Sequence, residues 1–243
     1  MTRLVGEARE RDALGTRASG VDPSLPLALR AEWHSRGRLP HWEASEVPQS
    51  ITFRLADSLP RAAVERELAT KGTRARGPRA AGTVALRDAA ARRARFEALL
   101  GAGYGECLLG RPKIAALVEN ALLYFDGTHY RLHAWRVMPN HVHVLVTPLA
   151  GFSLSSLLHS WKSFTAKAIN LALARRGPVW FEDYFDRRIR DEAHYAAALA
   201  YIENNPVAAG LCSRITKWEF SSAADKPAER ARLRGRLTGR AVG

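Results

Sequence analysis

The chain has 243 residues, of which 47% are hydrophobic and 25% charged, values that are ordinary for a soluble globular protein of one elaborated domain or two small ones. The formal net charge of +13 is not ordinary and indicates a polyanionic partner, for which nucleic acid is the usual candidate. No apolar run is long enough to cross a bilayer and Met1 to Gly20 lacks a secretory signal, so we expect a cytoplasmic protein without a membrane role.

The N-terminal third of the sequence gives few regular patterns. Residues 1–46 are rich in Arg, Gly and Pro, and we expect a partly disordered extension there. The alternation of apolar and polar residues predicts a first strand at 48–55. Residues 61–82 predict a helix followed by a basic loop, and 84–100 predict a second helix that ends at Gly101.

The middle of the chain is more regular. Residues 112–125 carry an apolar stripe at helical spacing, with Pro112 in the first turn. Residues 130–137 predict a strand that leads through a turn or kink into the next apolar segment, so the two segments form either a hairpin or one bent strand. A long helix is expected at 154–175, with Ser153 as its N-cap.

Two histidines separated by one residue stand in the segment that follows the kink. Because side chains alternate along a strand, His141 and His143 should point to one face and Val142 and Val144 to the other. Two imidazoles one strand step apart can bind a single metal ion if a further ligand comes from elsewhere. A lone His-x-His pattern also arises by chance, so ordinary half-buried or surface histidines are the alternative.

Residues 179–191 interleave aromatic and basic side chains. Aromatic rings can stack on unpaired bases and arginines can bind phosphates, but the same composition fits a connection whose aromatics pack in the core. Together with the lysines of the preceding helix, the candidate DNA-binding residues are Lys162, Lys167, Trp180, Tyr184, Arg187, Arg188 and Arg190.

A second candidate cluster lies about sixty residues after the histidines. Tyr201 and Asn205 are four residues apart, so on a continuous helix they would share a face. The sequence Asn205-Pro206 also fits an N-cap followed by proline at the first helical position, which predicts a new helix over 207–211. By residue type alone, Asn205 is expected to be a cap and Tyr201 a buried aromatic.

Three motifs in this order resemble a known family. The strand MPNHVHVLV, the segment FEDYFDRRIRDEAHY and the helix YIENNPVAAGL, with a first strand ITFRLADSLP, look like those of the single-tyrosine HUH transposases, and most like the REP-associated tyrosine transposases. The resemblance covers about residues 46–218. It implies an α+β fold in which helices pack on an antiparallel sheet of the ferredoxin-like or RRM-like kind, with the catalytic domain at 47–218 between the extension at 1–46 and a basic tail at 219–243.

The resemblance also implies a reaction and its residues. His141, His143 and Asn205 would hold Mg²⁺ or Mn²⁺, and Tyr201 would attack single-stranded or hairpin DNA. The product would be a 5′-phosphotyrosine with a free 3′-hydroxyl, which preserves the bond energy for joining a second strand. The implied protein is a monomer or homodimer associated with the nucleoid.

Two features depart from a minimal member of that family. The segment 61–112 is longer than expected, and the first 46 residues have no counterpart. A non-catalytic, domesticated nucleic-acid-binding protein with the same fold and basic surface is the alternative function. In either case we expect the C-terminal tail to be mobile and to contact phosphates through Lys226, Arg230, Arg232, Arg234, Arg236 and Arg240.

Overall fold

The computed structural model describes residues 32–34, 41–43, 46–60, 91 and 94–225. The expectations for residues 1–31, for the helix and basic loop at 61–82, for the beginning of the helix at 84–100, and for the tail at 226–243 therefore lie outside the described residues. Among the helices that are described, none is long and apolar enough to span a membrane.

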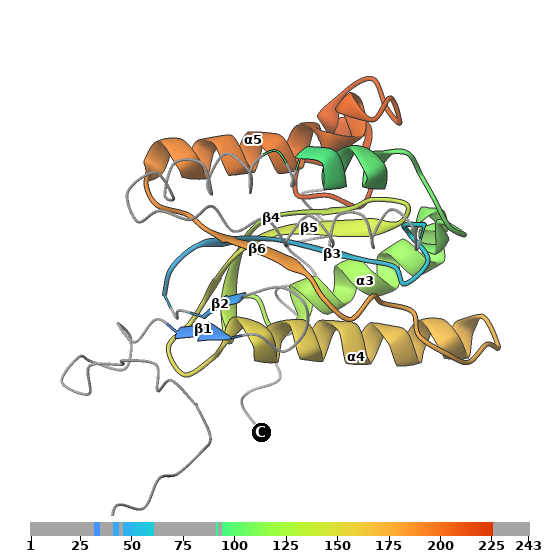
Figure 1. Ribbon diagram of the computed structural model, residues 1–243, viewed down its shortest axis with the longest axis horizontal. Coiled ribbons are helices and arrows are strands. Elements are labelled where there is room, and N and C mark those ends of the chain that lie inside the picture. The colour runs from blue at the N-terminus through green and yellow to red at the C-terminus, as the bar shows by residue number, and fades with distance from the viewer. Residues whose placement is uncertain (1–31, 35–40, 44–45, 61–90, 92–93, 226–243) are drawn as a thin grey trace, which may run out of the picture.

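A four-stranded antiparallel sheet forms the centre of the molecule (Figure 1). Its strands lie in the order β4-β5-β3-β6 and comprise β3 (Gln49–Arg54), β4 (Tyr130–Val137), β5 (His141–Pro148) and β6 (Phe185–Arg188). The predicted α+β class with an antiparallel sheet is confirmed. The segments on either side of the kink form a hairpin rather than one bent strand, because β4 and β5 pair antiparallel along their length. Two short strands, β1 (Glu32–His34) and β2 (His41–Glu43), pair with each other.

Helices cover the two faces of the sheet. The helices α3 (Pro112–Tyr124) and α4 (Leu154–Ala172) lie on one face and α5 (Glu192–Ala208) on the other (Figure 1). Short 3₁₀ helices occur at Leu108–Gly110 and Ile215–Lys217. The alternation of β5 explains this arrangement, because Val142, Val144 and Val146 join the main core with α3 and α4, whereas Leu145 packs in a smaller cluster with Ile202 of α5.

The helix α5 corrects the prediction that Asn205 caps a new helix. The helix begins after Asp191, whose side chain accepts a hydrogen bond from the backbone N–H of His194, and it continues through Pro206. Ile202 and Pro206 are one turn apart and both are buried. Proline is unfavourable inside a helix, but here it lies in the last turn, where the burial of this face offsets the lost hydrogen bond.

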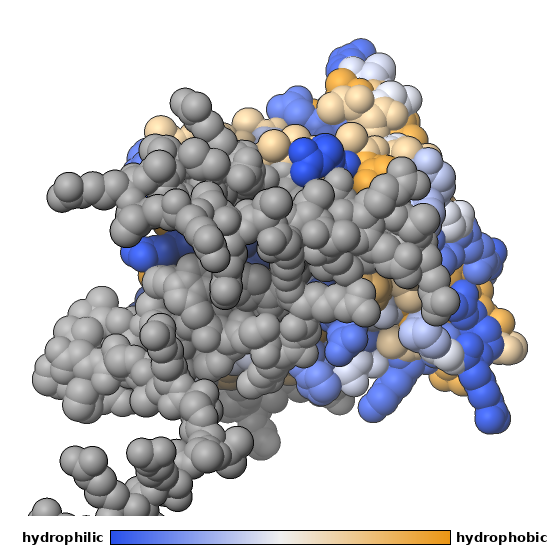
Figure 2. Space-filling model, in the orientation of Figure 1, coloured by the Kyte–Doolittle hydropathy of each residue, from blue (hydrophilic) through white to orange (hydrophobic). Residues whose placement is uncertain are grey.

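The residues that follow α5 return to the sheet. The backbone N–H of Val137 donates to the carbonyl of Phe220 at 3.0 Å, and that of Ser222 donates to the carbonyl of Trp135 at 3.0 Å. Residues 219–225 therefore cover the outer edge of β4, which would otherwise leave backbone groups unpaired. Where described residues are visible in Figure 2, hydrophilic and hydrophobic side chains are interspersed.

Candidate functional site

The two histidines of β5 lie together beneath α5. His141 and His143 are 2% and 1% exposed, and their Nε2 atoms are 2.9 Å apart. Their ring planes are nearly perpendicular, at 86°. Both imidazoles thus direct a ring nitrogen toward the same buried point.

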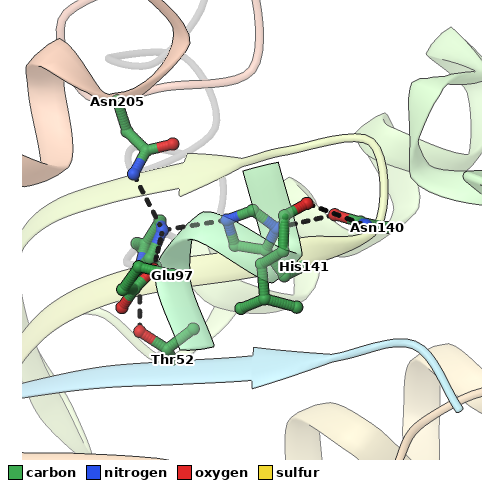
Figure 3. Close-up of polar contacts among 7 residues, drawn as sticks. Thr52, Glu97, Asn140, His141 and Asn205 are labelled. Carbon is green, nitrogen blue, oxygen red and sulfur yellow. Dashed lines mark hydrogen bonds and ion pairs between the residues drawn. The ribbon is translucent and has the colours of Figure 1, made fainter. Parts of the chain in front are cut away.

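The other ring nitrogen of each histidine is held by a polar side chain (Figure 3). The Nδ1 atom of His141 is 2.7 Å from Oδ1 of Asn140, and the Nδ1 atom of His143 is 2.9 Å from Oγ1 of Thr52 on β3. The amide of Asn140 donates to the carbonyls of Leu100 and Tyr104, which leaves its oxygen to accept from His141. His141 therefore carries its proton on Nδ1 and its lone pair on Nε2, the form that binds a metal.

Burial keeps His141 neutral. Desolvation lowers the pKa of His141 well below its ordinary value, and the neighbouring His143 lowers it further, while Glu97 acts in the opposite direction. A neutral imidazole is the protonation state that a metal ligand requires.

A carboxylate completes the cluster. Residues 94–101 are helical and place Oε2 of Glu97 3.7 Å from Nε2 of His143. The ligand atoms of Glu97, His141 and His143 all lie within 4.8 Å of one another, so the group could hold a metal ion. Sequence reasoning missed Glu97, because it is a single carboxylate in an arginine-rich helix with no motif spacing to the histidines.

The helix α5 contributes two side chains from above. Nδ2 of Asn205 is 3.2 Å from Nε2 of His143, and a flip of this amide would present its oxygen at the same position (Figure 3). The ring of Tyr201 packs edge to face on His143, with 5.4 Å between the ring centroids. Tyr201 is 36% exposed, so it is not the buried aromatic that its residue type suggested.

The candidate DNA-binding residues are divided between the two faces of the sheet. Arg187 is paired with Ser50 of β3, and Thr52 of the same strand is paired with His143. Because Ser50 and Thr52 are two residues apart, Arg187 lies on the same face of the sheet as His143. Arg188 points to the opposite face of the sheet. The helix α4 covers that face and carries Lys162 and the exposed Lys167. Arg190 is exposed beyond the end of β6.

Three members of this set are engaged within the protein. The Nζ atom of Lys162 donates to the carbonyls of Phe181 and Glu182, and burial lowers the pKa of Lys162 to about 8. Trp180 is 7% exposed and its ring packs against Phe53, which favours core packing over base stacking for this residue. Tyr184 is half-buried against the main core.

Comparison with known proteins identifies the central segment. Residues 117–205 match the model of a family described as transposase IS200 like. The matched segment contains both histidines, Tyr201 and Asn205, but neither Thr52 nor Glu97. The resemblance to this group of transposases is thereby confirmed, and the match supports a DNA-processing function. No protein with a curated description matches the sequence.

Two solved structures also match this chain. One is a REP-associated tyrosine transposase bound to a REP hairpin, with 17% identity, coverage of 80% of this chain and 84% of that chain, and a TM-score of 0.46. The other is a protein from Deinococcus radiodurans R1 whose assignment as a transposase is provisional, with 13% identity, coverage of 71% and 98%, and a TM-score of 0.35.

Proposed function

We propose that the protein is a metal-dependent transposase that nicks and rejoins single-stranded or hairpin DNA, because residues 117–205 match the IS200-like transposase family. Tyr201 is the proposed nucleophile. The observation that carries the proposal is the contact between the exposed Tyr201 ring and His143, a residue of the buried cluster that could hold a metal ion.

The proposed reaction exchanges one phosphate ester for another. The phenol oxygen of Tyr201 attacks the phosphorus, a bond forms between them, and the bond from phosphorus to the 3′-oxygen breaks. The proton lost by tyrosine is balanced by the proton that the 3′-oxygen takes up, so the products are a 5′-phosphotyrosine and a 3′-hydroxyl. Because the energy of the ester bond is kept, the reverse attack by another 3′-hydroxyl rejoins DNA without an external energy source.

The ligands proposed for the metal are His141, His143, Glu97 and the side-chain oxygen of Asn205. A divalent ion bound there would offset the negative charge of the phosphodiester and polarise its phosphorus. Of the two ions expected, we propose that Mn²⁺ binds more tightly than Mg²⁺. Mg²⁺ prefers oxygen ligands and keeps several waters, whereas a site with two imidazoles suits a transition metal.

The proposed partner is DNA that enters over the histidine face. The net charge of +13 favours phosphate binding, and Arg187 lies on the same sheet face as His143. We also propose that the protein is cytoplasmic and associated with the nucleoid, as a monomer or a homodimer.

A nicking assay tests the proposal against the non-catalytic alternative. A pool of hairpin oligonucleotides with single-stranded flanks is incubated with the protein and Mn²⁺, and covalent complexes are separated on a denaturing gel. The active enzyme gives an adduct, whereas the protein carrying both His141→Ala and His143→Ala still binds the DNA but gives none. Binding without any adduct by the parent protein would instead identify a non-catalytic DNA-binding protein.

A further inference from the structure

Each histidine of the cluster has a buried arginine as its direct neighbour on an adjacent strand. Arg54 of β3 is paired with His141, and Arg136 of β4 is paired with His143. Residues directly opposite each other on antiparallel strands point to the same face, with Cβ atoms about 4.5–5.5 Å apart. Arg54 is 3% exposed and Arg136 is 0% exposed, so a buried arginine is paired with each histidine in the sheet.

Arg54 has partners within the protein, although its Nη2 atom is buried without a hydrogen-bond partner among the described residues. Its Nη1 atom donates to the side chain of Ser58 at 3.1 Å and to the carbonyl of Leu55 at 3.3 Å. Its guanidinium carbon lies 3.5 Å from the centroid of the Phe181 ring, a distance typical of a cation–π contact. These contacts give Arg54 a structural role in joining β3 to the segment around Phe181.

Arg136 has no comparable partners among the described residues. Its Nε, Nη1 and Nη2 atoms are all buried, and none has a hydrogen-bond partner within the part of the chain that the structure describes. Burial has the largest effect and lowers the pKa of Arg136 to about 10, while Cys212 and Glu203 act in the opposite direction. The guanidinium is therefore charged at neutral pH. A buried charge without partners destabilises a fold, so its presence beside a candidate active site calls for a functional explanation.

We propose that Arg136 is a specificity-determining residue whose fixed positive charge favours the DNA phosphodiester over a metal cation at the His141–His143 site. The inference rests on the proposed function. His141 is an uncharged ligand, so in this low-dielectric region the charge of Arg136 repels a divalent ion and attracts the phosphate group. Arg136 acts through space and does not contact the reacting atoms.

The charge of Arg136 should weaken metal binding and strengthen DNA binding. A loss of structure, in contrast, would change both affinities in the same direction. At an effective dielectric constant of about 20, two unit charges about 10 Å apart change an affinity by roughly tenfold. Replacing Arg136 with Met removes the charge, keeps much of the volume and leaves no polar atom to satisfy. Disruption of the site would weaken the binding of both ligands, whereas removal of the charge strengthens metal binding and weakens DNA binding.

The experiment measures both ligands separately. Mn²⁺ binding is followed by calorimetry without DNA, and hairpin oligonucleotide binding is followed by fluorescence anisotropy in EDTA. The proposal predicts that Arg136→Met binds Mn²⁺ about tenfold or more tightly than the parent and binds the oligonucleotide about threefold or more weakly. Arg131→Met is the matched control, because Arg131 lies on the same strand but is exposed, where solvent screens its charge. This variant should bind Mn²⁺ as the parent does.

Folding is checked by the thermal midpoint, which should be no lower in Arg136→Met than in the parent because a buried charge without hydrogen-bond partners among the described residues has been removed. If that variant does not fold, Arg136→Gln supplies the same charge change. Unchanged or weaker Mn²⁺ binding by the folded neutral variant would overturn the inference, as would equal tightening in Arg131→Met. If the parent protein binds Mn²⁺ but forms no DNA adduct, the proposed function is overturned instead. If neither the parent nor Arg136→Met binds Mn²⁺, both proposals fail.

Discussion

The ring of Tyr201 rests edge to face on the ring of His143, with 5.4 Å between the centroids and 80° between the planes. Tyr201 comes from α5 and His143 from β5, so the contact joins the helix above the sheet to the buried cluster within it. Tyr201 is 36% exposed, whereas His143 is buried. This relationship distinguishes Tyr201 from the other tyrosines nearby.

Substitution of Tyr201 should abolish the covalent adduct without abolishing DNA binding. Tyr201→Phe removes one oxygen and keeps the ring on His143, so the fold and the DNA affinity should be retained while the adduct falls below detection. Tyr195→Phe is the matched control on the same helix, because the Tyr195 ring packs on His133 and not on the cluster. Denaturing gels measure the adduct, and its loss in Tyr195→Phe together with its retention in Tyr201→Phe would reverse the assignment.

The carboxylate of Glu97 should contribute to metal affinity. Glu97→Gln keeps the shape of the side chain but removes its charge, so we expect Mn²⁺ affinity to fall by about tenfold or more, in the range seen when groups that support a metal site are lost. Glu106→Gln is the control, because Glu106 is an exposed carboxylate that pairs with Arg111 and Arg175. Calorimetric titration distinguishes the two variants, and equal affinities would remove Glu97 from the site.

The two adjacent arginines of β6 should differ in their contribution to DNA binding. Arg187 shares the sheet face of His143 and Arg188 does not. Arg187→Ala should therefore weaken single-stranded DNA binding and reduce the slope of log affinity against log salt by about 0.7 for one lost phosphate contact. Arg188→Ala should leave this slope close to that of the parent. The reverse order of the two slopes would place the DNA on the opposite face.

Burial of Lys162 should make the stability of the protein depend on pH. Burial lowers the pKa of Lys162 from 10.5 to about 8. At a pH between these two values, Lys162 is therefore protonated in the unfolded chain and deprotonated in the folded protein. The unfolding free energy contributed by Lys162 should thus rise with pH across this window. Urea unfolding should show the parent gaining stability relative to Lys162→Met from pH 8 to pH 10, and a constant difference would contradict the burial of a charged lysine.

The regular strands and the histidine pair could be predicted because their signals are local. The two-residue alternation of β5 places His141 and His143 on one face whatever the strand pairs with. Similarly, the four-residue spacing of Tyr201 and Asn205 needs only a continuous helix. The local preference of Asn205-Pro206 for an N-cap predicted a new helix, but α5 continues through both residues. Burial of Ile202 and Pro206 outweighs the local preference.

The remaining parts of the site depend on contacts between distant segments. The four residues of β6 are too few to show a period, and they become a strand only by pairing with β3. Nothing in the sequence near Glu97 indicates that its helix reaches His143. Arg136 stands in a strand whose outer edge is covered by residues 219–225, and no local pattern predicts the burial of that arginine.

Peptide mapping of a trapped DNA adduct by mass spectrometry tests most directly whether Tyr201 is the nucleophile. Parent protein is incubated with the hairpin oligonucleotide pool and Mn²⁺, denatured, and digested with protease and nuclease. We expect a nucleotide joined through its 5′-phosphate to Tyr201. A nucleotide on Tyr195 or Tyr184, or an adduct that persists in Tyr201→Phe, would contradict it.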